Sequence, residues 1–131
     1  MKIAVVSDDG TTISQHFGRA TLYIVFTVEN GKVVNKEQRD KMGHRHFASS
    51  ESHEMHEGKH GYGAEAQSRH NMMADAIRDC QVLIAGGMGM GAYEGMKSYN
   101  IEPVVTDVGD AAEAVRLYAE GKLTNLMERL H

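Results

Sequence analysis

Six of the eight histidines in this chain of 131 residues lie in one stretch, at His44, His46, His53, His56, His60 and His70. Neutral imidazole binds iron, zinc, nickel and copper, so a local excess of histidine is typical of metal binding without selecting one metal. His44 and His46 can chelate an ion from an extended segment. His53, His56 and His60 are spaced to share one face of a helical turn. The alternative is a solvated polar loop that binds metal incidentally.

A glycine-rich loop is the second feature that could do chemistry. It reads Gly-Gly-Met-Gly-Met-Gly and follows an apolar run at 81–85. Its backbone N–H groups could cradle an anion or a metal cluster. The loop also matches the spacing of a dinucleotide-binding turn, and its glycines could simply allow close packing of a strand against a helix. The candidate binding residues in this loop are Gly86, Gly87, Gly89 and Gly91.

Carboxylates and one thiol give weaker signals. Two-metal phosphoryl transfer would need clustered acids, but the candidates stand in turn-forming or capping contexts. Cys80 is the single cysteine, and we expect it to be a small buried residue rather than a ligand. Iron–sulfur clusters assembled in place usually use several thiolates, so a cluster bound by this chain should arrive preformed. The acids considered are Asp8, Asp9, Asp107 and Asp110.

The apolar pattern predicts the elements that position these residues. The turn signal Asn30-Gly31 indicates an antiparallel hairpin, and a strand, a helix and a second strand after Cys80 indicate a parallel βαβ unit. Together these elements predict one domain over residues 1–131, with a five-stranded mixed sheet covered by helices on both faces and an irregular histidine-rich loop at about 40–63. We expect strands at 2–6, 22–28, from Val33, 81–85 and 101–106, and helices at 64–79, from the glycine loop to about Tyr99, and from Asp110 to Gly121.

This arrangement predicts where a ligand would bind. In open α/β sheets, ligands collect beyond the carboxyl ends of parallel strands. The loops at 7–17, 86–91 and 107–110 should therefore emerge at one edge of the sheet. His16 and Arg19 lie in the first of these loops or just beyond it.

Composition limits the classes of partner. The formal charge of −4 and the lack of a basic face argue against nucleic acid. No apolar stretch approaches the roughly 20 residues of a membrane span. The first apolar run is too short for a signal peptide, and one cysteine cannot form an internal disulfide. We therefore expect a cytoplasmic protein that contacts neither nucleic acid nor membrane; its oligomeric state stays open.

Three segments in combination resemble a known family. They are the opening Lys-Ile-Ala-Val-Val-Ser-Asp-Asp-Gly at 2–10, Ile-Ser-Gln-His-Phe-Gly-Arg-Ala at 13–20, and the glycine loop within 80–92. This combination resembles the dinitrogenase iron-molybdenum cofactor biosynthesis family, which includes NifX-like proteins and the C-terminal domain of NifB-like proteins. The similarity covers most of the chain apart from about 40–63. It implies a ribonuclease-H-like, three-layer α/β/α fold with strand order 3-2-1-4-5 and strand 2 antiparallel.

The resemblance also implies binding or carriage of iron–sulfur or iron-molybdenum clusters rather than catalytic turnover. It makes His16 a cluster-binding candidate, because the histidine of the His-Phe-Gly motif is such a candidate within the family. We expect an accessory protein without catalytic residues, in which Arg19 offsets the charge of the cluster and the partners are metallocluster donor or acceptor proteins. The alternatives are a small nucleotide- or phosphate-binding enzyme that uses the glycine loop, and a metal-free interaction domain.

Overall fold

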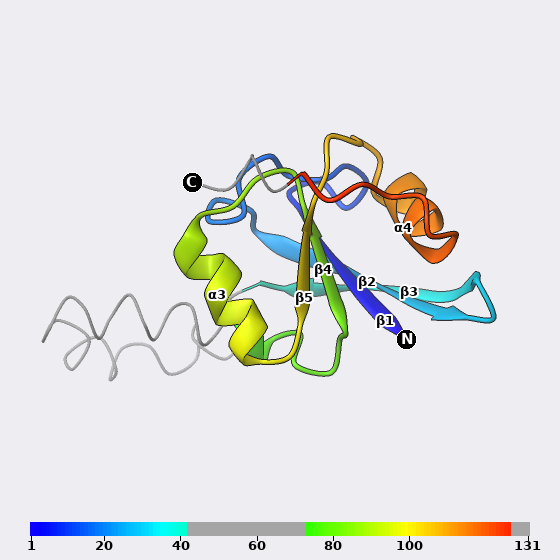
Figure 1. Cartoon of the computed structure of the whole chain (residues 1–131), viewed down its shortest axis with the longest axis horizontal. Coiled ribbons are helices and arrows are strands. Elements are labelled where there is room, and N and C mark those ends of the chain that lie inside the picture. Colours follow the sequence, from blue (N-terminus) through cyan, green and yellow to red (C-terminus); the bar gives the residue numbers. More distant parts are fainter. Residues whose placement is uncertain (42–72, 127–131) are drawn as a thin grey trace, which may run out of the picture.

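A five-stranded sheet forms the centre of the protein. The computed structural model describes residues 1–41 and 73–126. The strand order is β3-β2-β1-β4-β5 (Figure 1); β2 is antiparallel to β1 and β3, whereas β1, β4 and β5 are parallel. The mixed α/β sheet and its order are as expected, while the ribonuclease-H-like designation stays a prediction. The elements are β1 (Lys2–Ser7), β2 (Leu22–Glu29), β3 (Lys32–Asp40), β4 (Val82–Ala85), α3 (Met90–Ser98), β5 (Glu102–Val105) and α4 (Ala111–Ala119).

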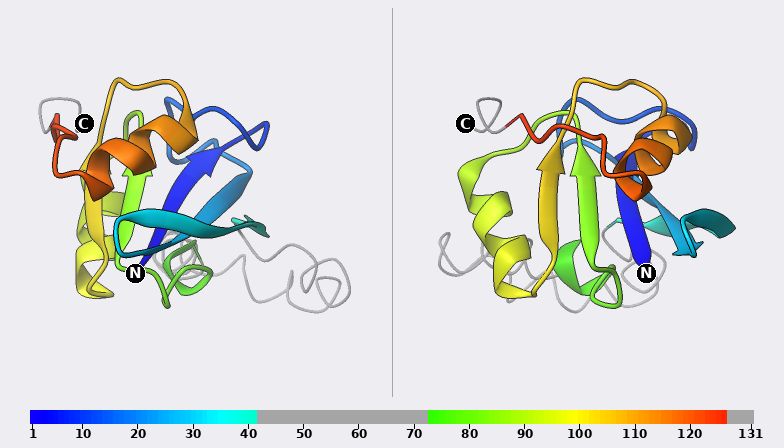
Figure 2. Two further views of the ribbon diagram at one scale, coloured as in Figure 1. Left: turned by 90° about the vertical axis from the view of Figure 1, so that its right-hand side faces the viewer. Right: turned by 45° about the vertical axis from the view of Figure 1, so that its right-hand side comes forward.

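Two buried clusters lie on opposite faces of this sheet. Successive side chains of a strand point to opposite faces, and β1 follows this rule. Ile3 and Val5 belong to one cluster, and Ala4 and Val6 belong to the other. Helix α4 covers the first cluster, and α3 together with residues 73–77 covers the second (Figure 2). The predicted layers of helix, sheet and helix are confirmed.

The hairpin of β2 and β3 turns at the predicted place. Asn30 and Gly31 both have positive φ, 55° and 77°, as a two-residue turn of this kind requires. A register irregularity between Thr27 and Val28 shifts the pairing by one residue. As a result, the last residue of β3 lies opposite Leu22, the first residue of β2. The end of β3 therefore returns to the edge of the sheet at which β1 ends.

Helix α4 has the capping groups that its sequence indicates. The carboxylate of Asp110 accepts the backbone N–H of Glu113 at 2.9 Å, which satisfies one of the free donors of the first turn. Gly121 follows the helix with φ of 74°. The N–H of Lys122 then donates to the carbonyl of Leu117 at 2.8 Å, which completes a Schellman ending. Both ends of α4 are therefore set by local sequence.

The helix expected at 64–79 ends earlier than the pattern predicts. Its described part is helical only at 73–75 and then turns. The hydroxyl of Tyr23 donates to the carbonyl of Met73 at 2.8 Å. The N–H of Ile77 instead reaches the carbonyl three residues back at 3.1 Å, which gives the tighter geometry of a closing turn. A contact from β2, distant in sequence, thus replaces a helical hydrogen bond.

In the described ranges no helix is long and apolar enough to cross a membrane.

Candidate functional site

The loop after β1 is fixed by its own side chains. The carboxylate of Asp9 accepts the backbone N–H groups of Thr11 and Thr12, both at 2.8 Å, and the hydroxyl of Thr12 at 2.8 Å. These donors hold the pKa of Asp9 well below its ordinary value. The hydroxyl of Ser7 accepts the N–H of Gly10 at 3.0 Å. The chain therefore leaves β1 in one defined turn, and the Asp9 carboxylate is occupied by that turn.

This loop is joined directly to the loop after β5. The N–H of Ile13 donates to the carbonyl of Gly109 at 2.8 Å, and the N–H of Ala111 donates to the carbonyl of Thr11 at 3.0 Å. The two loops thus continue the pairing of the chain beyond the end of the sheet. Asp110, which caps α4, lies in this contact through a bridge with the neighbouring threonine, Thr12.

The same loop also packs against the glycine loop after β4. The N–H of Gly86 donates to the carbonyl of Ser14 at 2.9 Å, and the N–H of Phe17 donates to the carbonyl of Gly87 at 3.0 Å. A β-carbon at position 86 would lie 2.8 Å from the Ser14 carbonyl oxygen and 3.0 Å from Cα of Gln15. Glycine is required here because two backbones approach closely. The three predicted loops therefore meet at one edge, where β1, β4 and β5 end (Figure 2).

His16 and Arg19 lie on one tight turn within this arrangement. The carbonyl of His16 accepts the N–H of Arg19 at 3.0 Å and of Ala20 at 3.1 Å. Phe17 and Ala20 are buried, whereas His16 and Arg19 are exposed. The apolar residues thus anchor the turn on the core and leave the imidazole and the guanidinium facing solvent. This presentation suits a ligand that approaches from outside.

Lys41 lies beneath this turn and was not singled out by the sequence pattern. Its side chain is 1% exposed, and Nζ donates to the carbonyl of Ala20 at 3.1 Å and lies 4.5 Å from the ring centroid of Phe17. Burial lowers the pKa of Lys41 to about 8, and the negative charge of Asp8 raises this pKa and so offsets part of the effect of burial. The pairing of β3 with β2 explains the position of Lys41. Asp40 pairs with Leu22, so the next residue along β3 falls beside the His16 turn.

The glycine loop leads into α3 without a side-chain cap from the described residues. Gly89 is the N-cap residue, no side chain within 1–41 or 73–126 accepts a hydrogen bond there, and the first turn has no acidic residue. Met88 is buried and anchors the loop, whereas Gly91 is exposed. Free N–H groups and the positive end of the helix dipole favour an anion at such a terminus. The N–H of Gly86 is already used by Ser14, so this glycine serves the packing of the loop.

The carboxylates at this edge serve mainly the local structure. Asp8 accepts the N–H of Thr21 at 3.0 Å and its hydroxyl at 3.3 Å. Asp9 and Asp110 accept backbone N–H groups as described above. The expected turn and capping contexts are therefore confirmed for Asp8, Asp9 and Asp110. Hydrogen bonds from the chain occupy oxygens that a two-metal site would need as ligands.

Cys80 lies away from the candidate site. It precedes β4 and is 3% exposed, so it sits at the opposite end of that strand from the glycine loop. Burial raises the pKa of its thiol to about 12. The expectation of a small buried residue is confirmed, and this thiol is held in its neutral form.

Metal-ligating residues do not gather into a closed set in the ranges 1–41 and 73–126, where no group of three or more His, Cys, Asp or Glu side chains could hold an ion. The predicted ligands His44, His46, His53, His56 and His60 lie outside the described residues. Lys41, the last described residue before that segment, lies at the site edge. A ligand bound within the described part would therefore rely on His16 together with charge and backbone donors.

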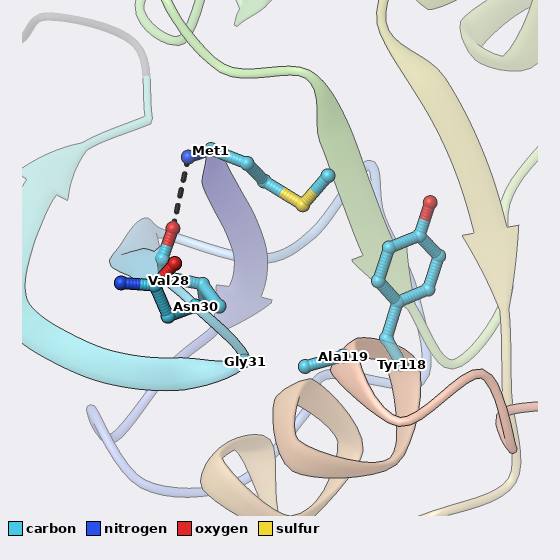
Figure 3. A pocket seen from close by; sticks show the side chains of 6 residues that line it. All are labelled: Met1, Val28, Asn30, Gly31, Tyr118 and Ala119. Atoms are coloured by element: carbon cyan, nitrogen blue, oxygen red, sulfur yellow. Dashed lines mark hydrogen bonds between the residues drawn. The ribbon is translucent and has the colours of Figure 1, made fainter.

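A pocket of about 290 Å³ lies at the other end of the sheet (Figure 3). Met1 lines the pocket, and its ammonium donates to the carbonyl of Val28 at 2.9 Å. None of the described residues predicted for the site lines this pocket. Among the lining residues, the charged group is the ammonium of Met1, and it is bonded to Val28. We therefore assign the site to the loop edge. The pocket is lined by Met1, Val28, Asn30, Gly31, Tyr118 and Ala119.

Comparison with known proteins finds similar chains of the same size. The family described as "Dinitrogenase iron-molybdenum cofactor" matches residues 1–121. The uncharacterized protein MJ0580 of Methanocaldococcus jannaschii is 30% identical over 124 residues, covering 94% of this chain and 89% of that protein. The crystal structure of PH0822 has a TM-score of 0.68 at 20% identity, with 96% of each chain covered. The apo form of the orange protein from Desulfovibrio gigas has a TM-score of 0.64 at 16% identity, covering 95% of this chain and 92% of that one.

Proposed function

The chain belongs to the dinitrogenase iron-molybdenum cofactor family, and from this premise we propose that it carries a preformed iron–sulfur or iron-molybdenum-type cluster as an accessory protein in metallocluster assembly. The family points to the handling of metalloclusters related to the iron-molybdenum cofactor. The cargo and its carriage at the loop edge are our proposal. They rest on the exposed turn that presents His16 and Arg19 beside the glycine loop.

Convergence of the three loops is the observation that carries the proposal. The Phe17–Gly87 hydrogen bond of 3.0 Å places the His16 turn against the chain that leads into α3. One imidazole, one guanidinium and the uncapped start of a helix thus lie at one edge of the sheet. This set offers a single metal ligand together with groups that stabilise negative charge.

Each group would then have a defined role. His16 would bind an exposed metal of the cluster through a ring nitrogen. Arg19 would donate charge-assisted hydrogen bonds to sulfide or carboxylate groups of the cluster. Gly87, Gly89 and Gly91 would let the cluster come close to the backbone at the start of α3, where backbone N–H groups would donate hydrogen bonds to it. Gly86 would hold the loop in place by its contact with Ser14.

The donor chemistry favours a preformed cluster over assembly in place. Iron–sulfur clusters are usually built on several thiolates, and the cysteine of this chain is buried at the far end of β4. A cluster that arrives with its own terminal ligands needs fewer ligands from the protein. The proteins that donate or accept such a cluster are the expected partners.

Transition-metal binding by the histidine-rich segment is a separate prediction from the sequence. It concerns His44, His46, His53, His56 and His60 and stands on their number and spacing. Iron, zinc, nickel and copper all fit imidazole ligands. We therefore treat this segment as an additional metal-binding region to be tested apart from His16.

A role without catalysis fits the use of the carboxylates at this edge. Asp9 and Asp110 are engaged by backbone N–H groups, so they support the loops rather than activate a nucleophile. A nucleotide-binding enzyme that uses the glycine loop and a metal-free interaction domain are the competing functions. Nucleotides that raise the melting temperature of the purified protein would favour the enzyme.

The test is anaerobic loading with a synthetic thiolate-ligated iron–sulfur cluster, followed by gel filtration and visible absorption of the protein fraction. We expect the wild type and His131→Ala to retain the chromophore and His16→Ala to lose it. Arg19→Gln should weaken retention by about tenfold, the size of one charge-assisted hydrogen bond. The surface variant Arg78→Gln is its matched control, since Arg78 is paired with Asp75 on an exposed turn. Equal retention by all five proteins would refute the proposal.

A further inference from the structure

The buried ammonium of Lys41 is a costly feature that the proposed function has not yet used. The residue is 1% exposed, and removing an ammonium from water costs several kcal/mol unless partners replace its hydration. Its described partners are one carbonyl, that of Ala20 at 3.1 Å, and the face of the Phe17 ring at 4.5 Å. Burial lowers the pKa of Lys41 to about 8. This direction agrees with an ammonium whose lost hydration is only partly replaced by the described contacts.

Packing alone does not require this charge. A methionine has a similar length and could fill the space without the desolvation cost, and replacing a buried charge by an apolar side chain is often neutral or stabilising. Among the described residues, the opposing charge nearby belongs to Asp8, whose carboxylate also accepts the N–H and hydroxyl of Thr21. On these described contacts, the buried ammonium is expected to cost stability.

The position of this charge connects it with the candidate site. Both described contacts of the ammonium belong to the turn that presents His16 and Arg19. Phe17 is the residue next to His16, and Ala20 is the residue next to Arg19. The charge thus lies on the protein side of the turn, and the two exposed groups lie on its solvent side. In a poorly polarisable interior a charge acts on a nearby ligand more strongly than a surface charge does.

We propose that Lys41 supplies a buried positive charge beneath the His16 turn that selects anionic metalloclusters over bare divalent cations. This inference rests on the proposed function and specifies its cargo as an anion. The negative charge of Asp8 favours cations instead. The two residues together therefore set whether the turn prefers an anionic cluster or a divalent cation. Lys41 is a positioning and electrostatic residue, since it acts on the cargo through the turn.

The test compares two probes of opposite charge under anaerobic conditions. One probe is a synthetic iron–sulfur cluster whose thiolate ligands make it a dianion, and the other is Co²⁺. The variants are made in a parent protein in which His44, His46, His53, His56 and His60 are replaced by alanine, so that those histidines do not bind Co²⁺. Lys41→Met should weaken cluster binding by about tenfold, the order of magnitude for one unit charge acting through protein, without weakening Co²⁺ binding. Asp8→Asn, which keeps an acceptor for Thr21, should shift the ratio of the two affinities the other way. Lys36→Met is the matched control, because Lys36 is exposed on the same strand.

The outcomes separate the inference from the proposed function. If Lys41→Met weakens both probes equally, or changes the ratio no more than Lys36→Met does, the charge has no selective role and the inference is wrong. If Lys41→Met does not fold, Lys41→Gln, which removes the charge but keeps a donor for the Ala20 carbonyl, takes its place, and an unchanged ratio in that variant refutes the inference. A wild-type protein that binds neither probe overturns the proposed function and the inference together.

Discussion

Replacing Gly86 by alanine should disturb the site edge at a known contact. The added β-carbon would lie 2.8 Å from the carbonyl oxygen of Ser14 and 3.0 Å from Cα of Gln15, with the Gln15 amide nitrogen at 2.9 Å. The amide can rotate away, but the two backbone atoms cannot. Ser14 is held by hydrogen bonds of 2.9 Å, as donor to Val6 and as acceptor from Gly86 itself. The substitution must therefore push the β1 loop away from the glycine loop.

The expected cost is about 2 kcal/mol of unfolding free energy. Overpacking costs about 1–3 kcal/mol, and a weakened hydrogen bond about 0.5–1.5 kcal/mol. Alanine also lowers the conformational entropy of the unfolded chain, which raises the unfolding free energy by about 0.4–1 kcal/mol. With a urea m-value of about 2 kcal/mol/M, the midpoint of unfolding should fall by about 1 M. Retention of the synthetic cluster should fall as well, because the His16 turn moves with Ser14.

Gly109→Ala is the matched control for this experiment. Gly109 lies at the same edge, but a β-carbon there would meet nothing within 4 Å. This variant should unfold at the wild-type midpoint or slightly above it. Urea denaturation followed by circular dichroism measures both proteins. Equal midpoints for Gly86→Ala and Gly109→Ala would refute the close approach of the two loops.

Three further predictions follow from individual side chains. The thiol of Cys80, with its pKa raised to about 12, should react with a thiol reagent at pH 8 only in urea; rapid reaction of the folded protein contradicts its burial. Asp110→Ala should lower the unfolding free energy by about 1 kcal/mol in urea titrations, because α4 loses its N-cap; an unchanged midpoint contradicts the cap. The pKa of Lys41 is about 8 in the folded protein, against an ordinary value of 10.5. Above pH 8 the unfolded chain therefore holds more protons, and the unfolding free energy of the wild type should rise relative to that of Lys41→Met between pH 8 and 10. A difference between these two proteins that does not change with pH contradicts the buried ammonium.

Local sequence signals predicted the strands, the hairpin and the parallel βαβ unit, whereas the strand order came from the family resemblance. The apolar run at 2–6 corresponds to β1, and the Asn30–Gly31 turn fixes the hairpin. Each of these features depends on neighbouring residues and on the period of a strand. The convergence of the three loops followed from topology, since parallel strands end at the same edge.

Contacts between distant residues were beyond such signals. The register irregularity between Thr27 and Val28 brings Lys41, rather than its neighbour Asp40, to the position beside the His16 turn. No local pattern indicates a one-residue shift of that kind. The early end of the helix before Cys80 has a similar cause, because the Tyr23 hydroxyl takes the carbonyl of Met73. The charge beneath the site therefore became visible only in three dimensions.

The iron and sulfide content of protein isolated anaerobically from its native source tests the central claim most directly. We expect iron and acid-labile sulfide in the wild type and in His131→Ala, and their loss in His16→Ala. A variant that replaces His44, His46, His53, His56 and His60 by alanine should keep the cluster at the loop edge. Iron and sulfide that persist in His16→Ala, or that disappear only when those five histidines are replaced, would contradict a cluster site at the His16 turn.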